Sequence, residues 1–137
     1  MWTIKTDSVT GMMKFRLTDD DGDVAASFRL NPADAKMLSR LEKTCAEAKE
    51  MADTAPAVTT GAEIEAYNDK LETMVCDALG LKHDAVFEVL PGTAILPGGD
   101  LYAVNVLATV ADAMAPEIAK RKANMQKAAA KYTAKYQ

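Results

Sequence analysis

The sequence has few of the residue types on which small catalytic, metal-binding and disulfide-stabilised domains depend. It contains two cysteines, Cys45 and Cys76, and one histidine, His83. Two cysteines are too few for a disulfide framework, and one histidine excludes a His-rich metal site and most His-based catalysis. With seven glycines and five prolines, the chain also differs from collagen and from flexible linkers.

Apolar residues are abundant, at 49% of 137 residues, and 26% are charged. This length fits one domain with a substantial core. Both cysteines lie at apolar helical positions, which predicts buried, reduced thiols. The first residues lack an apolar segment with a small-residue cleavage site, and no apolar run approaches the ~18 residues of a membrane span. We therefore expect a cytoplasmic protein with no membrane partner.

Motifs that carry enzymatic chemistry are missing. There is no nucleophile elbow, phosphate-binding loop, dinucleotide fingerprint or paired-cysteine zinc spacing. The Asp19–Asp23 segment suggests an EF-hand calcium loop. When Gly22 is aligned with the glycine of that loop, however, Leu17 and Phe28 fall at two ligand positions, and neither side chain can bind calcium. We interpret it as a turn, and His83 as a solvated residue just past a helix end. The sequence thus predicts a protein that is not an enzyme and needs no cofactor or metal.

The first thirty residues alternate as strands do. Apolar and polar residues alternate over 2–7, 13–18 and 24–30, and the intervening Asp7–Gly11 and Asp19–Asp23 segments have turn chemistry. This pattern predicts a three-stranded antiparallel meander. So small a sheet must pack one face on another element to be stable.

Two helices are expected next. The first should begin at Asn31 and Pro32, which suit the N-cap and first helical positions, and end near Asp53. A loop over 55–60 follows. Thr60 should cap the second helix, which Gly80 should end in the left-handed conformation. Together they predict an antiparallel helical hairpin, followed by a short helical segment within 81–90.

A last helical pattern begins at Asp100, with an apolar stripe that includes Leu101, Val104 and Leu107. Pro116 should end or kink this helix, because proline removes one hydrogen bond and clashes with the preceding turn. The remaining Ala- and Lys-rich segment has little to bury, so it should fray or become ordered on a partner.

These elements predict an α+β single domain. An N-terminal antiparallel β meander (1–30) should pack on a helical hairpin within a helical core (31–115). A long C-terminal helix should end in a basic helical tail (116–137).

Charge is distributed unevenly along the chain. From Glu117 onward there are six basic residues and one acid, a formal charge of +5, whereas the remainder has ten basic and nineteen acidic residues, or −9. Such asymmetry suggests an interaction tail. It could contact nucleic acid or dock on an acidic protein surface, including a second copy of this chain, or it could simply be a solvated helix end.

The order of elements resembles the small tail-assembly chaperones of long-tailed phages and prophages of Gram-positive bacteria. The segment 68–80 followed by 84–87 resembles that family's helix, Leu/Phe-Gly and closing Phe. The segment 115–122, with Lys131-Tyr132 beyond it, resembles its C-terminal helix. Leu81-Lys82-His83 departs from the family's glycine- and acid-rich turn.

The resemblance implies a viral protein of the bacterial host cytoplasm that binds the tape-measure protein and helps to recruit tail-tube subunits. The alternatives are a basic-tailed nucleic-acid-binding regulator and a self-assembling phage structural subunit. The eight methionines suit adaptable binding surfaces. The residues we expect to contact a partner are Met114, Ile118, Arg121, Lys122, Met125, Lys131 and Tyr132.

Overall fold

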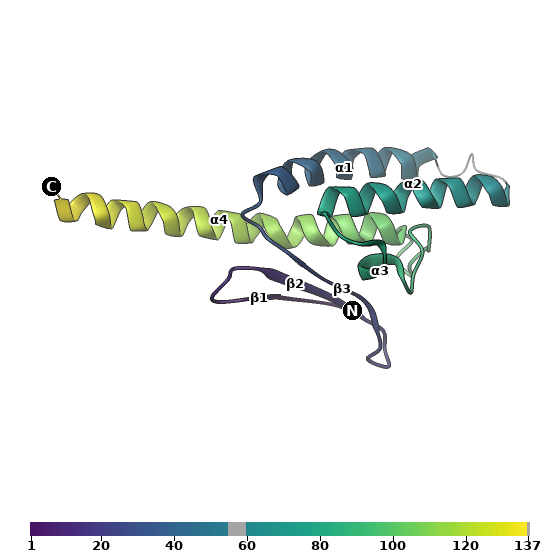
Figure 1. Ribbon diagram of the computed structural model, residues 1–137, viewed down its shortest axis with the longest axis horizontal. Helices are drawn as coiled ribbons and strands as arrows, with labels where there is room; N and C mark the ends of the chain where they lie inside the picture. The colour runs from purple at the N-terminus through teal and green to yellow at the C-terminus, as the bar shows by residue number, and fades with distance from the viewer. Residues whose placement is uncertain (55–59, 137) are drawn as a thin grey trace.

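The protein is α+β, with a three-stranded antiparallel sheet followed by helices. The computed structural model describes residues 1–54 and 60–136. α4 lies between the sheet and the α1–α2 pair, and its C-terminal end extends beyond both (Figure 1). The elements are β1 (Trp2–Thr6), β2 (Met13–Thr18), β3 (Val24–Leu30), α1 (Ala35–Thr54), α2 (Gly61–Leu79), α3 (His83–Phe87) and α4 (Tyr102–Tyr136).

The meander forms as its alternation predicts, in the order β1-β2-β3. Its inner face buries Phe15 and Phe28, whose rings stack 5.3 Å apart. Both predicted turns are confirmed: the Asp19 carboxylate accepts from two backbone N–H groups of its turn, and Gly11 and Gly22 have positive φ. The sheet is joined to α4 by the Trp2 indole, which donates to Asn105 at 2.9 Å.

The hairpin of α1 and α2 is also confirmed. Thr60 accepts from the Glu63 backbone N–H at 3.2 Å, and Gly80 ends α2 at φ 67°. The start of α1 differs from prediction. Asn31 accepts from Ala33 N–H in a separate turn, and the Asp34 carboxylate caps the helix by accepting from Met37 N–H at 3.1 Å. The predicted loop over 55–60 lies, apart from Thr60, outside the described residues.

The predicted long C-terminal helix is confirmed, but it differs from prediction in its buried face and in passing Pro116 without ending there. Its fully buried side chains include Tyr102, Val106, Val110 and Met114, rather than a stripe starting at Leu101, because α4 is contacted on more than one side. The helix also continues through Pro116 to Tyr136. Proline leaves the Asp112 carbonyl without its helical donor, but both residues are exposed, so water can reach this side of the helix.

Candidate functional site

One line of side chains runs along α4 from the core into solvent. Its members are spaced alternately by four and three residues, the spacing at which one helix packs along another. The inner part is Leu107, Ala111 and Met114. We call the outer part the outer seam, and it consists of Ile118, Arg121, Met125, Ala128 and Tyr132.

Burial is lost along this line beyond Met114. Leu107 and Met114 are buried, with Met114 only 1% exposed, and Ile118 is half-buried against the core. Beyond them, Met125 is 64% and Tyr132 68% exposed. The helix face that the body covers therefore continues outward, past the body, with large side chains still on it.

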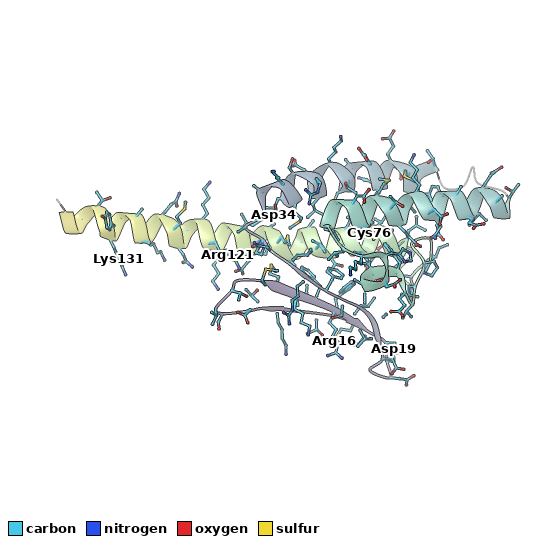
Figure 2. The ribbon with its side chains drawn as sticks, viewed as in Figure 1. Arg16, Asp19, Asp34, Cys76, Arg121 and Lys131 are labelled. Carbon is cyan, nitrogen blue, oxygen red and sulfur yellow. The ribbon has the colours of Figure 1, made fainter. Side chains whose placement is uncertain are left out.

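This placement divides the residues predicted to contact a partner. Met114 was expected to contact a partner, but this prediction is corrected because the side chain belongs to the hydrophobic core and is inaccessible. Arg121 is half-buried and serves as an anchor, since its Nε donates to Glu117 at 2.9 Å and its Nη2 donates to the Gly11 carbonyl at 2.6 Å. Figure 2 shows Arg121 where α4 passes the sheet. Arg121 thereby fixes the turn between β1 and β2 to the helix at the inner end of the outer seam.

The remaining residues expected to contact a partner lie on one part of α4. Lys122, Met125, Lys131 and Tyr132 all have exposed side chains on the part of α4 that extends beyond the body. Lys131 lies far out on this extension (Figure 2). Lys122 follows Arg121, and Lys131 precedes Tyr132, so cations flank the outer seam on both sides.

A second constellation was missed by sequence reasoning. Glu72 of α2 is only 6% exposed, yet carries a carboxylate. One of its oxygens accepts from the Asn68 amide at 2.6 Å and from the Gly92 backbone N–H at 2.9 Å. Asn68 in turn accepts from Thr93 N–H at 3.0 Å. One feature of the sequence could have indicated that Glu72 is buried: it lies within the apolar face of α2, between Leu71 and Val75.

His83 completes this group, which we call the Glu72 cluster (Asn68, Glu72 and His83). As expected, the residue is exposed and lies just past the end of α2. It also opens α3, and its Nε2 contacts the second oxygen of Glu72. Hydrogen bonding to Glu72, and secondarily to Asp84, raises the pKa of His83 above its usual value. The cluster therefore ties the segment 91–93 and α3 to α2.

The geometry of the cluster favours a structural role over a chemical one. The neighbouring thiol, Cys76, is half-buried, and burial together with the Glu72 and Asp77 charges raises its pKa to about 11. Such a thiol stays protonated and is a poor nucleophile at neutral pH. Both cysteines are free, as predicted, but they are half-buried rather than buried.

Two searches of the described residues bear on other classes of site. Within residues 1–54 and 60–136, no three His, Cys, Asp or Glu side chains gather as a metal site would require. In the same part of the chain, no helix is long and apolar enough to cross a membrane.

Comparison with known proteins gives no family for this chain. No protein-family model, no curated protein and no solved structure matches it. Function must therefore be argued from the molecule itself.

Proposed function

We propose that the protein is a non-enzymatic binding protein similar to a phage tail-assembly chaperone. In this role it holds apolar helices of the tape-measure protein against the outer seam of α4 and helps tail-tube subunits to assemble in the bacterial host cytoplasm. The observation that carries the proposal is the continuity of the line from buried Met114 to exposed Met125 and Tyr132. A helix face that packs on helices inside the body presents the same spacing to a helix from outside.

The charges around the outer seam define the partner more closely. Lys122 and Lys131 occupy the flanking positions, which set partner choice where helices pair. An antiparallel second copy of α4 would bring these lysines against lysines of its partner, so that pairing between copies is disfavoured. An apolar helix flanked by acidic residues fits best. The self-assembling subunit is thus the weaker alternative, and light scattering that shows only monomer would remove it.

Met125 also suits the expected range of partners. A tape-measure protein is long and presents many different helical segments, so a surface that receives it must adapt to several shapes. Methionine is unbranched and polarisable, and it packs against varied apolar surfaces. Alanines such as Ala128 leave room for a second helix to approach closely.

Co-purification with the tape-measure protein encoded near this gene tests the proposal. We expect the tagged full chain to retain it at low and moderate salt. Met125→Asp should lose this retention, because the substitution places a charge in the apolar line. Ala123→Asp is the matched control, since it adds the same charge on the opposite side of the same exposed turn and should retain the partner.

The outcomes separate the alternatives. Retention by Met125→Asp as strong as by the unmodified chain would show that the outer seam is not the binding surface. Failure of the unmodified chain to retain the tape-measure protein at either salt concentration would overturn the proposal itself.

A further inference from the structure

The outer face of the sheet carries a dense group of cations that the proposed function does not use. Strand pairing places Lys5 opposite Lys14, and Lys14 opposite Arg29, so three cations form one row across all three strands. The adjacent row is Thr3, Arg16 and Ser27. Figure 2 shows Arg16 on the side of the sheet that faces away from α4. We call these six residues the basic rows.

This arrangement costs stability, which calls for an explanation. Neighbouring strands lie about 4.8 Å apart, and like charges directly opposite one another on a sheet are destabilising. All four basic side chains are exposed, and within residues 1–54 and 60–136 none of them forms an ion pair or a hydrogen bond. Lysine often protects an exposed sheet edge from aggregation, but Lys14 lies on the central strand, where no edge needs protection.

The nearby acids neutralise the row only in part. Asp7 follows β1, and its Oδ1 already accepts from Val9 N–H at 2.9 Å and Thr10 N–H at 2.7 Å. These hydrogen bonds, with a lesser contribution from the Arg29 charge, lower the pKa of Asp7. The acidic turn Asp19–Asp23 lies beyond the far ends of β2 and β3 (Figure 2). The row of three cations thus remains the dominant charge at its end of the face.

We propose that the basic rows bind the phosphate backbone of a nucleic-acid duplex without reading its sequence. Every member of the rows is a cation or a hydroxyl residue, and these are the side chains that contact phosphate and sugar. The rows hold no aromatic residue on which single-stranded bases could stack, so a duplex is favoured over a single strand.

The same composition argues against a protein partner at this face. Protein interfaces have an apolar or aromatic centre, and the basic rows have none. A second copy is disfavoured as well. The three strands span only about 10 Å in width and at most about 23 Å in length, so this face offers far less than the roughly 800 Å² per partner that a stable dimer buries.

Four cations set the expected strength of binding. If each neutralises one phosphate, the logarithm of affinity should fall with the logarithm of salt concentration at a slope of about −3.6. Affinity should then drop roughly 150-fold between about 50 and 200 mM salt. Dissociation constants near physiological salt should lie at about 10⁻⁴ to 10⁻⁶ M, typical of binding without sequence preference.

The test is fluorescence anisotropy of a labelled DNA duplex, titrated with the full chain at several salt concentrations. The variant Lys14→Gln/Arg29→Gln should reduce the slope to about −1.8 and weaken binding about tenfold or more at low salt. Lys36→Gln/Lys43→Gln is the matched control, since it removes two exposed cations from α1 and should change binding little. Circular dichroism verifies that both variants are folded.

Four outcomes would overturn the inference. They are no saturable duplex binding at low salt, an equal loss in the α1 control, stronger binding of polyglutamate than of duplex, and binding that survives in the sheet variant but is lost in Lys122→Gln/Lys127→Gln/Lys131→Gln. The last result would move the nucleic-acid site to α4. None of these results depends on whether α4 binds the tape-measure protein, and the sheet variant should still retain that protein.

Discussion

The two halves of α4 belong to one helix but have opposite surroundings. From Tyr102 to Met114 the helix lies within the body and buries most of its large side chains. From Lys122 to Ala134 every side chain is exposed, including Met125 and Tyr132. The spacing of large side chains along the core-facing line nevertheless continues unchanged across Pro116 and Arg121.

This difference shows that the pattern of a helix and its burial are separate properties. The inner half obtains its stability from contacts within the chain, as helices in proteins generally do. The outer half has the same spacing, but its side chains over 122–134 are exposed. We propose that this exposed spacing receives a partner, and the following predictions test the contrast between the halves.

Truncation of methionine should have very different effects in the two halves. Met114→Ala should lower the free energy of unfolding by about 2–5 kcal/mol, because it leaves a cavity in the core. Met125→Ala should change it by less than about 0.5 kcal/mol, since the side chain is exposed. Urea unfolding of both variants measures this. Equal losses would show that the outer half packs on the body after all.

Pro116 lies at the boundary between the halves, and its replacement should stabilise the protein. Pro116→Ala restores the N–H that the Asp112 carbonyl lacks and should raise the free energy of unfolding by about 1–3 kcal/mol. Thermal unfolding followed by circular dichroism measures the change. A destabilised variant would indicate that the proline makes packing contacts that outweigh the lost hydrogen bond.

Arg121 anchors the boundary to the sheet, and its loss should loosen the outer half selectively. Arg121→Ala removes the hydrogen bond to Gly11 and the pair with Glu117, and should cost about 1 kcal/mol because the side chain is half-buried. Lys122→Ala, one position along, is the control and should cost much less. A similar cost for both substitutions would mean that the contact with the β1–β2 turn contributes nothing to stability.

The smallest expected effect is a pH dependence of the free energy of unfolding, caused by His83 of the Glu72 cluster. The pKa of His83 is raised in the folded protein, so its contribution should be complete below about pH 6.5 and should be lost as pH rises through the raised value. The difference in unfolding free energy between the unmodified chain and His83→Gln should therefore be larger at low than at high pH. Urea titrations across this range check it, and a difference independent of pH would contradict the proposed contact.

Local patterns predicted much of the fold, and tertiary contacts account for what they missed. Alternation and turn residues were enough for the meander, and Thr60 and Gly80 were enough for the ends of α2. These signals act over a few residues. The Glu72 cluster contacts segments 11 to 25 residues away along the chain. The one local signal, the position of Glu72 within the apolar face of α2, does not reveal these partners.

The candidate site was predicted only in part, for the same reason. The basic charge of this segment, and the exposure of Lys122, Met125, Lys131 and Tyr132, followed from composition and helical periodicity. The burial of Met114 depends on how α1, α2 and the sheet surround α4, which one sequence does not reveal. The basic rows depend on strand register, which pairs Lys5, Lys14 and Arg29 across 24 residues of chain.

Amide hydrogen exchange along α4 tests the central claim most directly, with and without the tape-measure protein. In the free chain, we predict strong protection over 106–116 and fast exchange over 122–134, because only the first segment is packed. Addition of the partner should slow exchange over 122–134 and leave 106–116 unchanged. Bound partner with exchange over 122–134 as fast as in the free chain would contradict the account.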